Sequence, residues 1–249
     1  MQYLTILGCG SSWGVPVIGC KCKTCSSPSS YNKRSRSSII IRDGVTSVLV
    51  DFGGDVRNQL LRENIDRLDA VILTHDHADH CSGLDDLRIF SLIHGMIPKF
   101  YSDHNTVDVV TKRYSYLFDK KALEPIGVDF DAKIRVGDIE IQLFKQDHGV
   151  MDSLGLRIKN TVYTNDVLRY PEESKQYLRN AKIWVADCVD YKSTGSHIGL
   201  DQAIQLYEEF TPERVYITNM SHDIDYFDIQ PQLPQNVSPA YDGLRLEII

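Results

Sequence analysis

The segment THDHADH at residues 74–80 constrains the fold and chemistry of this chain more than any other feature. It follows directly on the apolar run 70–73, which predicts a strand that ends at this segment. In an extended segment His75 and His77 point to the same side. Asp79 and His80 stand at the start of the following turn, from which their side chains can reach a second position close to the first. Imidazole and carboxylate are ligands for Zn(II), Mn(II) and Fe(II), so the segment predicts two adjacent metal positions.

The order of the predicted elements indicates the fold class. Short runs rich in Val, Ile and Leu predict strands, and runs with apolar residues on one helical face predict helices. Strands dominate the middle of the chain and helices occur in both halves, an order that suits two sheets packed face to face with helices outside. We therefore predict a single-domain α/β (α+β) protein, 1–249, with an αββα sandwich. The predicted strands cover residues 3–7, 38–42, 46–51, 70–74, 99–102, 133–136, 139–144, 154–159, 161–164, 183–186 and 215–218; the predicted helices cover 55–64, 84–93, 107–118, 172–179 and 200–210; the tail 229–240 predicts an extended strap.

Composition limits the partners that the chain is expected to have. Its 249 residues include 27 Lys and Arg against 34 Asp and Glu, a formal net charge of −7, which gives no overall field that gathers nucleic acid. No stretch reaches the roughly 18 apolar residues of a membrane-spanning helix, and the first residues lack the features of a signal peptide. We therefore expect a cytoplasmic protein that binds neither membranes nor nucleic acid.

The segment 74–80 resembles the HxHxDH signature of the metallo-β-lactamase superfamily. Four residues match it: His75, His77, Asp79 and His80. The resemblance implies the αββα fold, two divalent ions, zinc or manganese, at one edge of the sheets, and two further ligands that follow later strands. His148 and Asp166 stand in such positions, with Asp166 as the bridge between both ions. Asp79 is expected to serve in catalysis as well as in metal binding.

Three cysteines stand close together in the N-terminal part of the chain. Cys20, Cys22 and Cys25 are spaced C-x-C-x₂-C, so three thiolates can converge on one ion, and a distant His can complete a tetrahedral Cys₃His site. A closed site of this kind supports structure and leaves no position for a substrate. The spacing therefore predicts a structural zinc that pins the loop at about 8–37.

The same loop narrows the resemblance to a subfamily. The run GSSWGVP at residues 10–16, followed by CxCxxC, resembles the phosphodiesterases that act on phosphoribosyl 1,2-cyclic phosphate. In those enzymes the last strand ends in THxxH, where the first His completes the second metal site and the second His closes the zinc. Here the stretch is TNMSH, so Asn219 stands at the first position and His222 at the second.

This departure leaves two questions open. An amide oxygen is a weaker ligand than imidazole, so Asn219 predicts a second ion that is bound loosely, bound through water, or absent. His222 has two possible places, the zinc or the active site, and is expected to be a ligand in either.

A further histidine is a candidate for catalysis. His197 lies in the Gly/Ser-rich stretch 193–199, and the resemblance implies that it protonates the leaving group. Asp187, at the end of a predicted strand, is a candidate partner that orients His197 or a metal-bound His. The resemblance thus implies a metal-dependent phosphoric diester hydrolase for a small, cyclic phosphodiester, acting by attack of a metal-bound hydroxide.

Two other functions fit parts of the pattern. A tRNA 3′-processing endoribonuclease shares the HxHxDH site, but the chain has no long Gly/Pro/Lys-rich insertion and its negative charge disfavours a large polyanion. A non-catalytic protein with a degenerate metal site is supported by Asn219 alone. The aromatic residues Tyr114, Tyr116, Phe118 and Tyr226 are candidates for a homodimer contact or for the wall of a substrate cleft.

Overall fold

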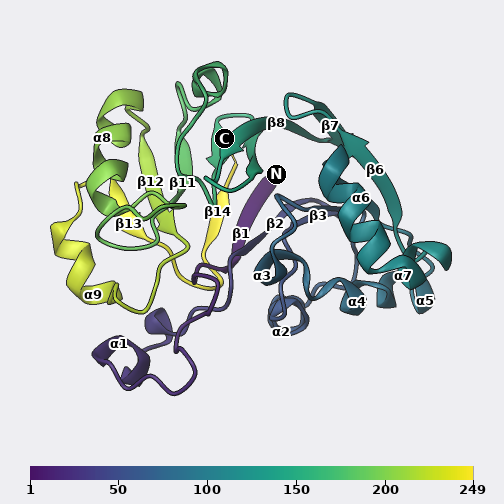
Figure 1. The fold of residues 1–249 in the computed structure, drawn as a ribbon, viewed down its shortest axis with the longest axis horizontal. Coiled ribbons are helices and arrows are strands. Elements are labelled where there is room, and N and C mark those ends of the chain that lie inside the picture. The colour runs from purple at the N-terminus through teal and green to yellow at the C-terminus, as the bar shows by residue number, and fades with distance from the viewer. Residues whose placement is uncertain (249) are drawn as a thin grey trace.

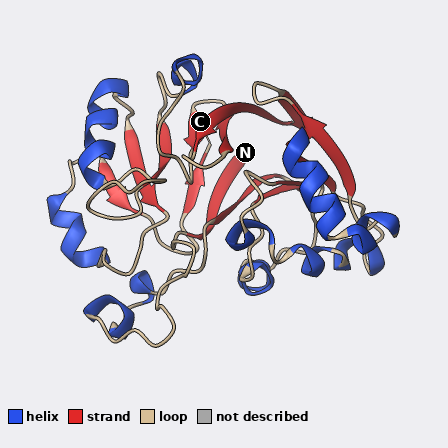
Figure 2. Ribbon diagram, in the orientation of Figure 1, coloured by secondary structure: helices blue, strands red, loops and turns tan. Residues whose placement is uncertain are grey.

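Two seven-stranded sheets face each other in the structure, a computed structural model that describes residues 1–248 (Figure 1, Figure 2). The first sheet holds, in spatial order, β14 (Arg245–Glu247), β1 (Gln2–Gly8), β2 (Ser38–Asp43), β3 (Thr46–Val50), β4 (Ala70–Ile72), β5 (Lys99–Asp103) and β6 (Glu124–Val128). The second holds β13 (Val237–Pro239), β12 (Arg214–Thr218), β11 (Ile183–Asp187), β10 (Thr161–Tyr163), β9 (Asp152–Ile158), β8 (Ile139–Asp147) and β7 (Lys133–Val136).

Helices cover the outer faces of the two sheets. Most of the helices in the first half of the chain lie beside the first sheet, and those of the second half lie beside the second (Figure 1). The helices are α1 (Lys23–Ser26), α2 (Val56–Arg62), α3 (Ala78–Cys81), α4 (Leu84–Leu87), α5 (Ile89–Leu92), α6 (His104–Arg113), α7 (Ser115–Asp119), α8 (Leu200–Phe210) and α9 (Tyr226–Ile229), with 3₁₀ turns η1 (Ser30–Asn32), η2 (Glu172–Tyr177) and η3 (Gln230–Gln232). The predicted αββα sandwich is confirmed. Among residues 1–248, the structure contains no helix with the length and apolar character needed to span a bilayer.

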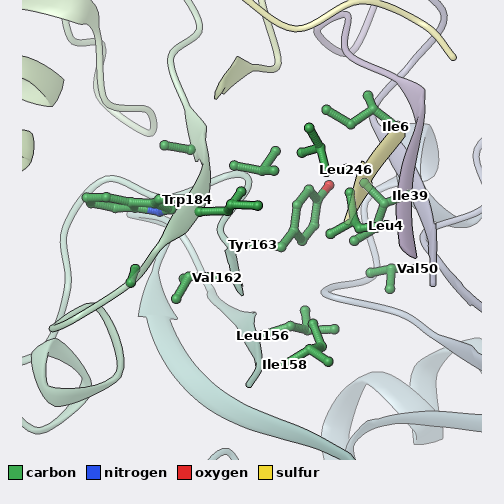
Figure 3. Close-up of a cluster of buried hydrophobic side chains, with 14 of the residues drawn as sticks. Leu4, Ile6, Ile39, Val50, Leu156, Ile158, Val162, Tyr163, Trp184 and Leu246 are labelled. Carbon is green, nitrogen blue, oxygen red and sulfur yellow. The ribbon is translucent and has the colours of Figure 1, made fainter. Parts of the chain in front are cut away.

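The central sheet strands are buried on both faces. In β2, Ile39 and Ile41 pack between the two sheets, whereas Ile40 packs against the helices outside. Because both faces are covered, these strands appear in the sequence as continuous apolar runs rather than alternating ones. Tyr163 fills the space between the sheets together with side chains of β1, β2, β3 and β9 (Figure 3). Trp184 points to the other side of the second sheet and packs against Tyr207 and Phe210 of α8.

Strand direction brings the ends of several strands to one edge of the sandwich. In the second sheet β10, β11 and β12 run parallel, so their carboxyl ends lie side by side. In the first sheet β4 runs parallel to β3 and β5. A hydrogen bond from the Leu154 amide to the Thr74 carbonyl, 3.1 Å long, joins the end of β4 to β9 in the facing sheet. Loops from both sheets therefore meet at this edge.

Several predicted helices differ from the observed ones. The predicted helix 84–93 is two short helices, α4 and α5, which are separated at Arg88. The predicted helix 107–118 begins earlier, at His104, and is interrupted at Tyr114, whose φ of −119° and ψ of 37° are not helical. The segment predicted as helix 172–179 is the 3₁₀ turn η2. Apolar spacing alone does not report such interruptions, because each piece keeps its apolar face toward the same core.

The prediction of an extended strap at 229–240 is wrong in part. The segment contains the 3₁₀ turn η3 and then β13, which forms the edge of the second sheet beside β12. Proline is tolerated in β13 because an edge strand has one unpaired side. The sequence analysis also missed β6 and β14. β14 pairs antiparallel with β1, with Glu247 opposite Tyr3, so the last strand joins the sheet that contains the first.

Candidate metal centre and active site

The loop that follows β4 carries the HxHxDH residues at the edge where the sheets meet. The β3–α2 turn supports this loop from below, and the amide of Phe52 donates a 2.6 Å hydrogen bond to the carbonyl of His80. A Cβ atom at Gly53 would lie 1.9 Å from the carbonyl oxygen of Asp79. Only glycine permits this close approach, so Gly53 lets the turn pack directly against the backbone of the loop that carries Asp79 and His80.

A first group of potential ligands comprises three imidazoles and one carboxylate. The structure brings His75, His77, His148 and Asp166 together with one donor atom from each within 4.8 Å of the others. Asp166 Oδ2 lies 3.3 Å from His75 Nε2 and 3.9 Å from His148 Nε2. His75 and His148, 73 positions apart in the sequence, follow β4 and β8 of different sheets and converge here as expected.

A second group shares the same carboxylate. Asp79, His80 and Asp166 also place their donor atoms within 4.8 Å of one another. His80 Nε2 lies 2.8 Å from Asp166 Oδ2 and 3.4 Å from Asp79 Oδ2. Asp166 follows β10 with a φ of +49°, a left-handed conformation that aspartate tolerates better than most residues. The turn aims its carboxylate between the two groups.

Hydrogen bonds behind the imidazoles fix their orientation. His80 Nδ1 lies 2.8 Å from Asp51 Oδ2, and His148 Nδ1 donates to the carbonyl of Ser196 at 2.8 Å. Each bond leaves Nε2 facing the pocket as a potential ligand atom. The sequence analysis missed Asp51, although an aspartate at the end of a buried strand, followed by Gly53 and Gly54, was a usable signal.

Burial and mutual charge set the protonation of this cluster. Burial lowers the pKa of His80, but the carboxylates of Asp166 and Asp51 outweigh it and raise that pKa well above its usual value. Burial and the charge of His80 lower the pKa of His75 well below its usual value. Burial raises the pKa of Asp166, but His80 and His75 lower it well below the usual range overall. A buried carboxylate that stays ionised among imidazoles fits a bound divalent cation.

His197 and Asp187 form a pair on the same pocket. His197 Nδ1 lies 3.3 Å from Asp187 Oδ2 and 3.6 Å from Asp166 Oδ1. Burial lowers the pKa of His197, but the hydrogen bond and charge of Asp187 raise it to about 9. The expected role of Asp187 as a partner that orients His197 agrees with this geometry.

Asn219 lies at the end of β12 between the same carboxylates. Its Nδ2 donates to Asp166 Oδ1 at 2.6 Å and to Asp187 Oδ1 at 2.8 Å. Its Oδ1 faces the hydroxyl of Ser37, which lies 3.5 Å away. The side chain therefore reaches the predicted place, but with its amide nitrogen toward the site.

The cysteine cluster is a separate site. His222 Nδ1 lies 3.3 Å from the Sγ atom of Cys20, 3.5 Å from that of Cys22 and 3.7 Å from that of Cys25. The amide of Cys25 donates to Cys22 and lowers the pKa of that thiol to about 6, which favours the thiolate that binds zinc. Of the two places left open for His222, the structure shows the one beside the thiols. Three sulfurs and one imidazole fit a tetrahedral zinc.

The pocket in front of the His/Asp groups has a volume of about 280 Å³. Its lining includes Ser11 and Ser12 from the loop after β1, and Val150 and Val189 from loops of the second sheet. None of the aromatic residues that were candidates for a cleft wall lines this pocket in the described part of the chain. The remaining lining residues are His77, Asp79, His148, Asp166, Ser196, His197 and Asn219.

A profile of the family described as "Beta-lactamase superfamily domain" matches residues 46–220, which include both His/Asp groups. The chain belongs to the metallo-β-lactamase superfamily. Membership of this superfamily implies that the chain binds a divalent metal, and the two His/Asp groups fit such an ion. Since the profile ends at residue 220, the metallo-β-lactamase match does not include His222 of the cysteine cluster.

A solved structure of a similar protein matches this chain over its whole length. The crystal structure of a new diphosphatase from the PhnP family is 32% identical, with a TM-score of 0.94, and the match covers 100% of this chain and 98% of the other. This supports the predicted resemblance to the PhnP-like metallo-β-lactamases.

Two curated relatives are matched over only part of their own length. The octanoyltransferase of Porphyromonas gingivalis is 33% identical over 249 residues, which is 96% of this chain and 50% of that protein. The ribonuclease Z of Methanopyrus kandleri is 27% identical over 124 residues, 47% of this chain and 42% of that protein. This chain therefore spans about half the length of the first relative and matches less than half of the second.

Proposed function

We propose that this chain is a metal-dependent hydrolase of small phosphodiesters, including cyclic ones. The observation that carries the proposal is the Asp166 carboxylate, which is shared by two groups of buried ligands and has His197 beside it. The arrangement places a cation-binding site and a proton donor on one pocket. Hydrolysis of a phosphodiester needs both, because charge develops on the phosphoryl oxygens and on the leaving oxygen.

The four donors His75, His77, His148 and Asp166 would hold a divalent ion. When bound, such an ion polarises phosphoryl oxygens and lowers the pKa of a bound water from about 15.7 to about 7. The chain supplies the geometry for this chemistry through the hydrogen bonds that orient His80 and His148. The Ser196 carbonyl, which accepts from His148 Nδ1, belongs to the loop that carries His197. That loop therefore aligns both a ligand and the proton donor.

His197 is the residue that protonates the leaving oxygen. Asp187 accepts a hydrogen bond from its ring and keeps the imidazole charged at neutral pH. His197 lines the pocket beside Asp166, so its imidazole is placed to protonate the leaving oxygen of a phosphodiester that binds there. General-acid catalysis by a positioned imidazole contributes about 10²–10⁴ in rate.

The size of the pocket supports a small substrate. Its volume of about 280 Å³ is close to the lower end of the range for ligand pockets, about 300–1,000 Å³. The similar PhnP-family protein is described as a diphosphatase, which also breaks a bond at phosphorus. Probes for this chain are therefore a cyclic ribose phosphodiester, a diester of diphosphate and bis(p-nitrophenyl) phosphate.

A tRNA 3′-processing endoribonuclease is the second candidate, favoured by the 27% identity to a ribonuclease Z. The net charge of −7 disfavours a large polyanion. Cleavage of a precursor tRNA at a rate above that of the small probes would establish this second function instead.

The name of the octanoyltransferase belongs to a protein twice as long as the stretch that matches. Half of that protein lies outside the match, so its name does not by itself describe the stretch that is similar to this chain. We therefore assign no acyl transfer to this chain.

The deciding experiment measures hydrolysis of the three probes by the full chain, before and after removal of divalent ions with a chelator. We expect turnover that disappears with the chelator and returns with Zn²⁺ or Mn²⁺. His75→Ala should lower turnover by at least about 100-fold. His94→Ala should not change it, because His94 is exposed and belongs to neither His/Asp group. Metal binding without turnover of any probe would favour the non-catalytic alternative.

A further inference from the structure

We infer that the side-chain amide of Asn219 replaces a metal ligand with a hydrogen-bond donor, so that the pocket holds one divalent ion tightly and a second only weakly. The inference rests on the proposed metal site and specifies its stoichiometry. It depends on how Asn219 is oriented, and the sequence alone did not reveal that orientation.

The contacts of Asn219 fix which end of its amide faces the site. Both acceptors, Asp166 Oδ1 at 2.6 Å and Asp187 Oδ1 at 2.8 Å, are carboxylate oxygens that accept hydrogen bonds and cannot donate them when ionised. The atom between them must therefore be the NH₂ group, and its two hydrogens satisfy both. The reversed amide would place its oxygen against two carboxylates. The hydroxyl of Ser37 lies on the opposite side, facing Asn219 Oδ1.

The amide nitrogen occupies a position that a cation could otherwise take. Asp166, Asp187 and His197 place their donor atoms within 4.8 Å of one another, a spacing that could hold an ion. Asn219 Nδ2 lies within hydrogen-bond distance of both carboxylates of this group. Its two N–H groups thus supply the positive dipole that the pair of carboxylates needs, without an ion.

The two groups that share Asp166 are left unequal. The group of His75, His77 and His148 with Asp166 offers four protein donors. The group of Asp79 and His80 offers three, since Asp166 is its third member and the Asn219 oxygen faces away. A hydrogen-bond partner behind a ligand already changes metal affinity by about 10–100-fold, so a missing ligand should cost at least about 100-fold.

The backbone at Asn219 permits a direct test by substitution. Its φ is +62°, a left-handed conformation in which asparagine, aspartate and histidine are the side chains most often tolerated. Asn219→His adds an imidazole and Asn219→Asp adds a carboxylate, and both abolish the amide donor between the acids. Asn64→His is the matched control, because Asn64 has a φ of +52° and is exposed in a different part of the chain.

The experiment is native mass spectrometry of the full chain over a range of Mn²⁺ concentrations, with zinc counted separately by elemental analysis. Mn²⁺ prefers oxygen and imidazole ligands over thiolates, so it reports on the pocket rather than the cysteine cluster. We expect the parent chain and Asn64→His to bind one Mn²⁺, and a second only at a concentration at least about 100-fold higher. Asn219→His should bind two Mn²⁺ within one concentration range, and Asn219→Asp should also strengthen the second.

Each outcome decides between separate claims. Two Mn²⁺ bound with equal affinity by the parent chain would overturn the inference and leave the proposed hydrolase intact. A second ion that stays weak in both Asn219 variants, with zinc content and circular dichroism unchanged, would also overturn it. Failure of every form to bind Mn²⁺ in the pocket would instead contradict the proposed function and this inference together.

Discussion

Replacement of the buried Arg34 by methionine should destabilise the contact between the cysteine loop and the loop that carries His222. Arg34 is 1% exposed, and its Nη2 donates to the carbonyls of Ser221 at 3.0 Å and Ile224 at 2.7 Å. These carbonyls lie on either side of His222 in the chain. Arg34→Met keeps most of the side-chain volume but removes both donors, so the variant tests the hydrogen bonds more than the packing.

The expected magnitude follows from these two bonds. The Ile224 carbonyl then has no partner among the described residues, which costs about 1–3 kcal/mol. The Ser221 carbonyl keeps a 3.3 Å hydrogen bond from the Ile224 amide, so the loss of its bond to Arg34 costs about 0.5–1.5 kcal/mol. Methionine also relieves the desolvation of a charge that has no carboxylate within hydrogen-bond distance among the described residues, which offsets part of this cost. We therefore expect a loss of about 1.5–3 kcal/mol in the free energy of unfolding.

The assay is urea unfolding at fixed zinc concentration, with zinc retention measured on the same samples. Arg67→Met is the control, because Arg67 lies in an exposed ion pair with Asp69 and its loss should leave the unfolding midpoint unchanged. A change below about 1 kcal/mol for Arg34→Met, with full zinc retention, would refute the view that this guanidinium holds the two loops together.

Three further predictions concern the core, the loop and the proton donor. Trp184→Ala should cost about 3–5 kcal/mol in unfolding free energy because it leaves a large cavity between the second sheet and α8; a cost below about 1.5 kcal/mol by urea unfolding would show that the core collapses around it. Gly53→Ala should lower both the unfolding midpoint and the metal content because its Cβ would clash with the Asp79 carbonyl, whereas Gly195→Ala, with open space around its Cβ, should leave the unfolding midpoint unchanged; equal unfolding midpoints for the two variants would be inconsistent with a loop held by Gly53. Asp187→Asn removes the charge that raises the pKa of His197, so the alkaline fall in kcat should move to lower pH as His197 loses its proton earlier; an unchanged pH profile would exclude His197 as the acid.

The sequence predicted those ligands of the site that lie close together on one loop. The HxHxDH residues lie on one loop, so their spacing alone places two ligands together and two more nearby. The resemblance to the metallo-β-lactamase superfamily implied two further ligands after later strands, and His148 and Asp166 were assigned because each follows a predicted strand. The same reasoning placed Asp187 beside His197.

What escaped prediction depends on contacts between distant segments. Asp51 supports His80 from a neighbouring strand, and nothing in the local spacing of residues 74–80 reports that contact. The orientation of the Asn219 amide depends on the positions of two carboxylates from β10 and β11, which only the assembled sheet provides. The interruption at Tyr114 is likewise a tertiary effect, because the apolar pattern continues through it.

Anomalous diffraction from crystals grown with Mn²⁺ or Zn²⁺ tests the central claim most directly, since it locates each ion without reference to activity. The account predicts a strong peak among the donor atoms of His75, His77, His148 and Asp166. A pocket with no peak there, in crystals whose cysteine cluster is loaded with zinc, would contradict it.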